Sequence, residues 1–196
     1  MKKYFIIALT LALPAVFFSC NESKYRAELK TIDSLNIVLD SIHNKLGEID
    51  TILIKKEYKE YLGNIELLKK YFNDKKEDST WKIMTSYGAV KSSLKQFISD
   101  YPGFYSEISF SRTQLDSLKK DIKSGDLEKE KIKEYTKTES EFVSKLETLV
   151  NLSVGRAKLK LELLDSLNPE VTEVIGKLKK EWKFDKDSNP TEIEDD

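Results

Sequence analysis

A stripe of apolar residues between positions 32 and 53 constrains the fold of this chain more than any other feature. Its members are Ile32, Leu35, Leu39, Ile42, Leu46, Ile49 and Leu53. They are separated alternately by three and four residues, which is the heptad spacing that packs one helix against another. Only four prolines interrupt the 196 residues, and the long runs are rich in leucine, lysine and glutamate, which favour helix. The sequence therefore predicts an all-α fold, an elongated antiparallel helical bundle.

Turn residues divide the rest of the chain into about five expected helices. Two of them are long, over residues 24–73 and 127–167, and a short helical hairpin over residues 79–123 lies between them. Gly47 and Gly63 are expected to be weak points of the first long helix, because glycine weakens a helix, and a kink or a break is expected at Gly63. A single helical domain is expected to cover residues 25–182.

Two prolines are expected to end helices. Pro102 fixes one dihedral of a turn and Gly103 accepts the positive one, which predicts the tip of the hairpin. The residue before a proline avoids the helical region, so the pair Asn168 and Pro169 is expected to end the second long helix, and a short fifth helix follows. The acidic segment 183–196 is expected to be a disordered tail, because it has few apolar residues to bury.

The unequal lengths of the expected helices predict a head and a stalk. The hairpin helices are about half as long as the two long helices at 1.5 Å per residue, so they cover only half of the long pair. We expect the covered half to lie where the chain turns, and the other half, near the start of the chain, to be a thin coiled-coil stalk. The rival arrangement is a coiled coil that closes by dimerisation.

The distribution of aromatic residues supports the same arrangement. They concentrate between Lys55 and Phe142, whereas residues 24–54 contain only Tyr25. Wide four-helix cores need bulky side chains, while a narrow seam is filled by Leu, Ile and Val. The second long helix is expected to contribute a core stripe of Tyr135, Phe142, Leu146, Leu149, Val150, Ala157, Leu161 and Leu164.

The chain begins with a basic pair and a short apolar run. Lys2 and Lys3 precede 15 uncharged residues at positions 4–18, fewer than the ~20 that a helix needs to cross a bilayer. A basic start, a short apolar run and an abrupt switch to polar residues are typical of an export signal. The run is followed by Ser19 and by Cys20, the only cysteine of the chain.

This segment resembles the signal peptide of bacterial lipoproteins, in which a small residue precedes the cysteine that becomes the lipidated first residue of the mature chain. The resemblance implies that residues 1–19 are removed, that Cys20 carries a diacylglyceryl thioether with acyl chains such as palmitate, and that residues 20–24 form a tether. Asn21 is not the aspartate associated with inner-membrane retention, which implies the outer membrane of the cell envelope. The alternatives are an uncleaved signal anchor and a plain secreted protein.

The composition argues against several kinds of chemistry. With Cys20 lipidated, the mature chain has no thiol for a disulfide, a nucleophile or a metal site, and His43 is its only histidine. It contains no glycine-rich phosphate loop, no H-E-x-x-H motif and no G-x-S-x-G motif. The 33 basic and 34 acidic residues balance each other, which argues against nucleic acid as a partner. We therefore expect no enzymatic activity, no catalytic residues, no cofactor and no metal.

An aromatic cluster at the expected hairpin tip is the candidate site for binding a partner. It comprises Tyr101, Phe104, Tyr105 and Phe110, and tyrosine is common in binding hot spots, although such residues also serve as core. We interpret the chain as a non-enzymatic helical scaffold or adaptor, anchored to the lipid bilayer through Cys20, that binds another envelope protein. The alternative is a binding module whose bundle core holds a small ligand.

Overall fold

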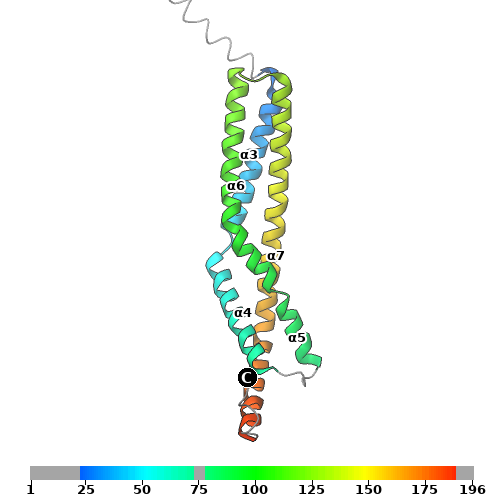
Figure 1. Cartoon of the computed structure of the whole chain (residues 1–196). Coiled ribbons are helices and arrows are strands. Elements are labelled where there is room, and N and C mark those ends of the chain that lie inside the picture. Colours follow the sequence, from blue (N-terminus) through cyan, green and yellow to red (C-terminus); the bar gives the residue numbers. More distant parts are fainter. Residues whose placement is uncertain (1–22, 73–77, 189–196) are drawn as a thin grey trace, which may run out of the picture. The chain divides into compact units, whose positions relative to one another are not determined.

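The computed structural model describes residues 23–72 and 78–188, and the regular elements within them are α-helices (Figure 1). These helices are α3 (Arg26–Gly47), α4 (Thr51–Tyr71), α5 (Asp78–Gly88), α6 (Lys91–Ser124) and α7 (Lys129–Ser188). No strand occurs in the described ranges. The prediction of an all-α helical bundle is therefore confirmed.

The described chain forms two compact units. Unit 1 comprises residues 23–48 and 102–151, and unit 2 comprises residues 49–72, 78–101 and 152–188. The helices α6 and α7 each contribute one segment to unit 1 and another to unit 2. The helical region that was expected to be a single domain thus has two groups of internal contacts.

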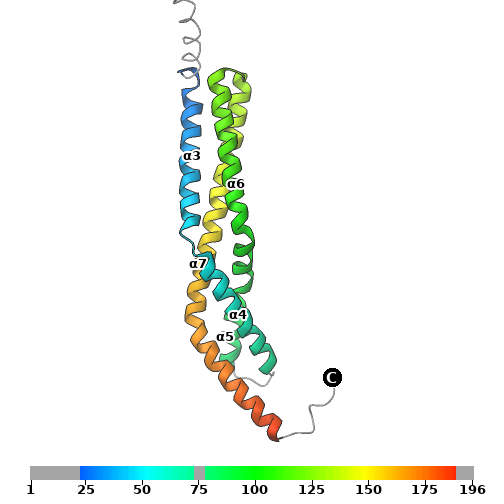
Figure 2. The same ribbon diagram turned by 90° about the vertical axis from the view of Figure 1, so that its left-hand side faces the viewer.

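Three helical segments make up unit 1. Within it, α6 runs antiparallel to both α3 and α7, which share one direction (Figures 1 and 2). A tight turn joins α6 to α7, and Gly125 has a φ of 80° there, in the left-handed region that favours glycine. Polar contacts between side chains tie α3 to both neighbours. The ammonium group of Lys119 on α6 lies 2.5 Å from a carboxylate oxygen of Asp33, and that of Lys45 donates a hydrogen bond of 2.5 Å to Oδ1 of Asn151 on α7.

The expected hairpin over residues 79–123 is not observed, because α6 continues through Pro102. A proline inside a helix removes one backbone hydrogen bond and costs about 3 kcal/mol. The apolar periodicity nevertheless continues on both sides of it: Leu94 and Phe97 are buried in unit 2, and Ile108 is buried in unit 1. A continuous helix keeps both sets of side chains in cores, and this burial outweighs the local turn signal.

The path of α6 also contradicts the prediction of a thin stalk near the start of the chain. Residues 102–124 of α6 pack beside α3 in unit 1, and Lys119 reaches Asp33 near the beginning of α3. The first helix is therefore covered near the start of the chain, where the sequence predicts a stalk. The second long helix also differs in direction, since α7 runs parallel to α3 within unit 1 and the return is made by α6 (Figure 2).

The first long helix, expected over residues 24–73, breaks at Asp50. The Asp50 carboxylate caps α4, because it accepts hydrogen bonds of 2.9 Å from the backbone N–H groups of the second and third residues that follow it. Gly63, the expected break, lies inside α4. The heptad stripe therefore serves α3 as far as Leu46, which is buried, whereas Leu53 is exposed.

The expected helix end at Pro169 is also not observed, because α7 continues through this proline. The hydroxyl group of Thr172 donates a hydrogen bond of 2.8 Å to the carbonyl oxygen of Asn168. On either side of the proline, Leu164 and Val171 are buried in unit 2. As at Pro102, continued burial on both sides explains why the helix does not end.

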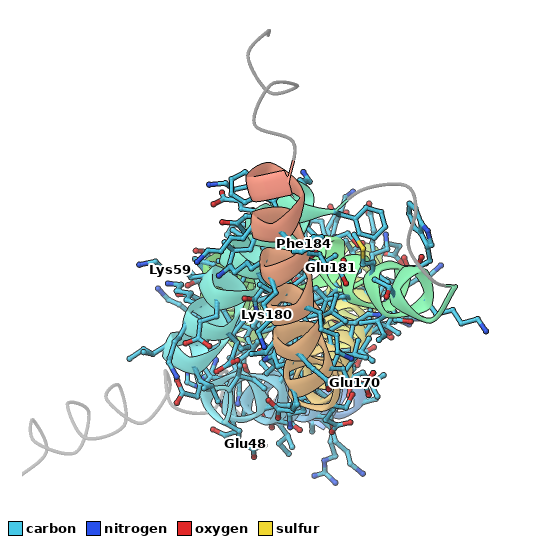
Figure 3. The ribbon with its side chains drawn as sticks, turned by 90° about the horizontal axis from the view of Figure 1, so that it is seen from below. Glu48, Lys59, Glu170, Lys180, Glu181 and Phe184 are labelled. Carbon is cyan, nitrogen blue, oxygen red and sulfur yellow. The ribbon has the colours of Figure 1, made fainter. Side chains whose placement is uncertain are left out.

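The predicted fifth helix is the last part of α7, which reaches Ser188. The segment 183–188, assigned from the sequence to the acidic tail, is thus helical, and residues 189–196 lie outside the described part. Near the end of α7, Phe184 is 72 % exposed. Figure 3 shows Phe184 on α7 together with Lys180 and Glu181.

Unit 2 contains segments of four helices and has an aromatic core. Tyr61 of α4, Tyr87 of α5 and Phe97 of α6 are at most 1 % exposed, and the ring centroids of Tyr61 and Tyr87 lie 4.9 Å apart. Unit 1, with three segments, has an aliphatic core in which Tyr25 is the buried aromatic residue. The expected relation between bundle width and side-chain size therefore holds, but the aromatic core belongs to unit 2 and does not extend to Phe142.

The hydroxyl group of Tyr87 joins three helices of unit 2. It accepts a hydrogen bond of 3.0 Å from Nδ2 of Asn64 on α4 and donates one of 3.0 Å to Oδ1 of Asn168 on α7. Buried polar groups destabilise a fold unless they have such partners. This network therefore fixes how α4 and α7 lie against α5 within the unit.

Tyr61 is expected to ionise only at a very alkaline pH. Its burial, with a smaller contribution from the Tyr87 and Tyr58 phenols, raises the pKa of Tyr61 from 10.0 to about 12. Because the folded-state pKa is the higher one, the neutral phenol stabilises the fold fully below pH 10 and progressively less as the pH rises to about 12. Burial also raises the pKa of Tyr87, so phenolate absorbance should show a late component that Tyr61→Phe reduces, together with a weaker alkaline loss of unfolding free energy. A late component of unchanged amplitude in Tyr61→Phe would contradict the assignment.

Candidate functional site

The predicted lipidation site, Cys20, and the predicted signal peptide over residues 1–19 lie outside the described residues. No helix of the described ranges is both long and apolar enough to span a membrane. Ser23, the first described residue, follows Cys20 by three positions, so at most about 11 Å of chain separates them. A lipid on Cys20 would thus hold the beginning of α3 close to a bilayer surface.

The four aromatic residues predicted to bind a partner do not form one exposed patch. Tyr101 belongs to unit 2, where its ring centroid lies 5.6 Å from that of Phe97 on α6. Tyr105 lies edge-on to His43 of α3, with ring centroids 5.2 Å apart. Phe104 is half-buried, and Phe110 is 57 % exposed. Of the four, Phe110 is therefore the one that unit 1 presents to solvent.

Unit 1 also carries an apolar strip that its own core does not use. The strip consists of Tyr135, Phe142 and Leu149 of α7, which are 43 %, 38 % and 52 % exposed. Their spacing of seven residues places them on one face of the helix. Val143 and Val150, each one residue further along, are fully buried. The strip therefore lies beside the core stripe, about 100° around the helix.

The sequence predicts both stripes of α7 as core, and for the apolar strip this prediction is wrong. A helix in a three-helix unit turns one face toward its two neighbours, so only one of two adjacent stripes is buried. The buried stripe includes Ile132, Val143, Leu146 and Val150, in which steps of three and four residues occur. The strip repeats only every seven residues, and this difference in spacing is the signal that distinguishes the two stripes.

The rim of the apolar strip is charged. Glu139 lies between Tyr135 and Phe142 along α7 and is half-buried, and this burial raises the pKa of its carboxyl group. The ammonium group of Lys131, one turn before Tyr135, lies 5.7 Å from the centroid of the Tyr135 ring. An apolar centre with a polar rim is the usual anatomy of a protein–protein interface.

Ion pairs at heptad spacing join α3 to α6 within unit 1. Asp40 pairs with Arg112, and Asp33 pairs with Lys119, each at 2.5 Å. The two acids are seven residues apart, and so are the two cations, so the pairs form successive rungs of an α3–α6 ladder. Exposed pairs contribute only about 0–1 kcal/mol each, so this ladder aligns the helices more than it stabilises them.

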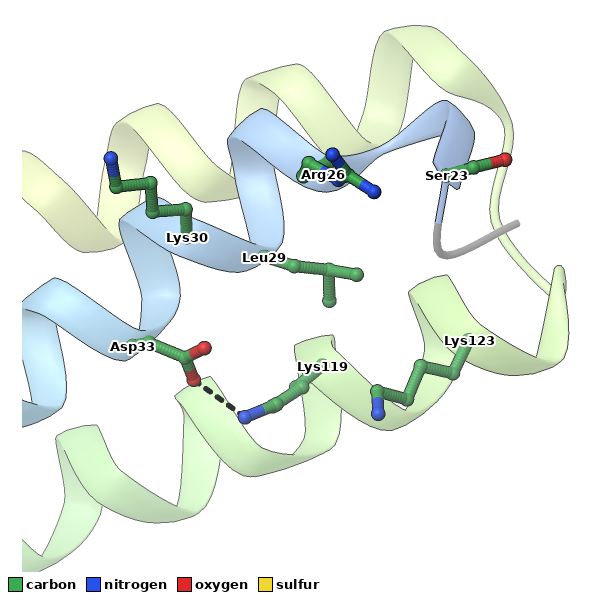
Figure 4. A pocket seen from close by; sticks show the side chains of 7 residues that line it. All are labelled: Ser23, Arg26, Leu29, Lys30, Asp33, Lys119 and Lys123. Atoms are coloured by element: carbon green, nitrogen blue, oxygen red, sulfur yellow. Dashed lines mark hydrogen bonds and ion pairs between the residues drawn. The ribbon is translucent and has the colours of Figure 1, made fainter. Parts of the chain in front are cut away.

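A pocket of about 510 Å³ lies at the end of the α3–α6 ladder where α3 begins and α6 ends (Figure 4). Its lining residues are Ser23, Arg26, Leu29, Lys30, Asp33, Lys119 and Lys123. Four of these side chains are cations, and the single acid, Asp33, is already paired with Lys119. Figure 4 shows Leu29 between the two helices and the ammonium groups of Lys119 and Lys123 extending from α6. We call this site the cationic pocket.

The described residues offer few groups for covalent chemistry. The hydroxyl groups of Ser111 and Thr136 are buried in unit 1 without a hydrogen-bond partner, and the imidazole of His43 packs against Tyr105. Within residues 23–72 and 78–188, no three His, Cys, Asp or Glu side chains are grouped so that they could hold a metal ion. The features with distinct chemistry are therefore two surfaces, the apolar strip and the cationic pocket.

Both surfaces belong to unit 1. Comparison of the chain with protein-family models, with curated proteins and with solved structures finds no match.

Proposed function

We propose that this protein is a lipid-anchored, non-enzymatic adaptor of the cell envelope that binds another envelope protein through the apolar strip of unit 1. The observation that carries the proposal is the exposure of Tyr135, Phe142 and Leu149 at heptad spacing on a helix whose core face is already filled. The proposed anchor is the acylated Cys20, in keeping with the lipoprotein-like sequence that precedes it.

The shape of the strip indicates what kind of partner it fits. Tyr135 and Leu149 are 14 residues apart on one helix, about 21 Å at 1.5 Å per residue. Side chains at this spacing act as knobs for the holes of a neighbouring helix. The proposed partner therefore offers an amphipathic helix, with an apolar stripe for the three side chains and charged flanks for Glu139 and Lys131.

The small-ligand module remains the alternative function, and packing in unit 2 weighs against it. A ligand inside a bundle needs an apolar cavity of a few hundred cubic ångströms. In unit 2, however, Tyr61, Tyr87 and Phe97 are at most 1 % exposed, and the rings of Tyr61 and Tyr87 pack against each other. The exposed Phe110 of unit 1 fits the adaptor function better, because it offers apolar surface outside a core.

Photo-crosslinking in the intact envelope tests the adaptor proposal. A benzophenone amino acid at Phe142 of the full chain is expected to give one discrete, heavier adduct whose crosslink maps to the apolar face of a partner helix. The double substitution Tyr135→Ser and Leu149→Ser is expected to lower the yield by at least about tenfold, because interface anchors of this kind carry most of the binding energy.

Phe184 provides the matched control, since it is an exposed phenylalanine outside unit 1. The same benzophenone residue at position 184 should give no such adduct. Equal adducts from both positions, or a yield at Phe142 that the double substitution leaves unchanged, would count against the apolar strip. An adduct with a small molecule in place of a protein would support the alternative function.

A further inference from the structure

We infer that the cationic pocket of unit 1 binds a phosphate-bearing anion, and that the anionic headgroup of a phospholipid beside the lipid anchor is its source. The headgroup source depends on the proposed membrane anchoring, whereas the charge of the pocket does not. The inference rests on three observations: the reversed order of charges at the end of the ladder, the composition of the pocket, and its position in the chain.

The α3–α6 ladder changes its charge pattern at the end where α3 begins. On α3 the heptad positions 40 and 33 are acids, and each pairs with a cation of α6, Arg112 or Lys119. The next heptad positions are Arg26 on α3 and Asp126 just beyond the end of α6, so the order of charges is reversed there. Arg26 and Lys123 of α6 line the pocket, whereas Asp126 does not, so both helices contribute cations to the pocket. Like charges at close range repel each other, so an anion between them is favoured.

Few charges of the protein are available to neutralise this end of the ladder. Asp33 is engaged by Lys119, and Asp126 of the α6–α7 turn does not line the pocket. The described residues provide no hydrogen-bond or ion-pair partner for the side chain of Arg26 or Lys30. Two of the four pocket cations therefore lack an internal counter-charge among the described residues.

The chemistry of the pocket suits a phosphate group. Arg26 is one of only three arginines in a chain whose positive charge is otherwise lysine. Its guanidinium group presents a planar fork that matches two phosphate oxygens, while lysine ammonium groups act as mobile point charges around it. Leu29, which is 9 % exposed, also lines the pocket, so the accessible lining is mainly cationic.

The position of the pocket points to a membrane as the source of the anion. Ser23 lines the pocket and follows Cys20 by three residues, about 11 Å of chain at most. This distance is close to the Debye length of about 8 Å at physiological ionic strength. Basic residues held so close to an anionic leaflet are attracted to it, each by about fivefold in affinity.

Protection of lysines against chemical acetylation tests the inference. The full chain carrying Cys20→Ala would be studied in neutral detergent micelles, with phosphatidylglycerol or inorganic phosphate added in parallel, and the rate at each lysine read by mass spectrometry. Phosphatidylglycerol is expected to slow labelling of Lys30 and Lys123 while Lys59 and Lys158, exposed lysines of unit 2, remain unaffected. Arg26→Gln should raise the half-saturating phosphatidylglycerol content about fivefold.

Arg156→Gln is the matched control, because it removes an exposed arginine of unit 2; it should leave the protection unchanged. Protection by phosphatidylglycerol alone supports the headgroup source, and protection by inorganic phosphate as well supports the pocket with a free anion as its source. Uniform protection of all four lysines, no protection by either anion, or equal effects of the two arginine substitutions would overturn the inference. A wild-type chain that carries no acyl group would instead refute the anchor and leave the pocket result standing.

Discussion

Replacing Tyr87 with alanine is expected to lower the free energy of unfolding by about 4 kcal/mol, the typical loss for a large buried aromatic side chain. Tyr87 is fully buried in unit 2, where its ring contacts Tyr61 and its hydroxyl group bridges Asn64 and Asn168. The substitution therefore removes packing and leaves two side-chain amides without their partner. Chemical denaturation followed by circular dichroism measures the loss.

The conservative variant Tyr87→Phe separates the hydroxyl group from the ring. It keeps the packing but removes both hydrogen bonds, so we expect a smaller loss of about 1–3 kcal/mol. In a double-mutant cycle, Tyr87→Phe and Asn168→Ala should be non-additive, because they remove the same hydrogen bond. Phe110→Ala is the control for loss of a ring, since Phe110 is exposed, and it should change stability by less than about 0.5 kcal/mol. Equal losses for Tyr87→Ala and Phe110→Ala would contradict the core role.

Replacing Cys20 with serine is expected to abolish acylation of the protein completely. Cys20 is the only cysteine, so no other thiol is available to form a thioether. Two acyl chains anchor a protein stably, since each buried methylene contributes about 0.8 kcal/mol, and their loss removes the main membrane attachment that we propose. Incorporation of labelled palmitate, together with the intact mass of the purified chain, measures the change.

The substitution Asn21→Ser provides the control, because it alters the adjacent residue and leaves the thiol in place; it should retain the label. The two alternatives predict different masses for the wild-type chain. An uncleaved signal anchor would give an unlabelled chain that still contains residues 1–19, and a secreted protein would give an unlabelled chain that lacks them. Either result would refute the lipoprotein interpretation.

The helical class was predictable from the sequence, whereas several helix boundaries were not. The heptad stripe correctly marks the buried face of α3 as far as Leu46, because that spacing reports directly on packing. Pro102 and Pro169 were predicted to end helices but lie inside α6 and α7. The backbone preferences of proline and of the residue before it concern only neighbouring residues. They contain no information about apolar side chains that are buried several helical turns away. The break before α4 is locally readable, since Gly47 is a predicted weak point and Asp50 is an acid followed by a helical run, whereas the break expected at Gly63 does not occur.

The candidate surfaces were less predictable than the fold. The apolar strip was visible in the sequence as Tyr135, Phe142 and Leu149, but which of two adjacent stripes faces the core depends on the number of neighbouring helices. Unit 1 has three segments, so one stripe remains outside. The cationic pocket combines Arg26 with Lys123, nearly a hundred positions apart in the sequence. It becomes visible only once the direction of α6 against α3 is known.

The left-handed turn at Gly125 has a consequence for any tethered form of the protein. Because α6 runs antiparallel to α3 within unit 1, this turn lies at the same end of the unit as Ser23, and the pocket shared by Ser23 and Lys123 shows how near they are. A lipid on Cys20 would therefore bring two non-contiguous segments to the lipid–water boundary. Depth of immersion would then be governed by the turn as much as by the tether, because whichever segment protrudes further meets the headgroups first.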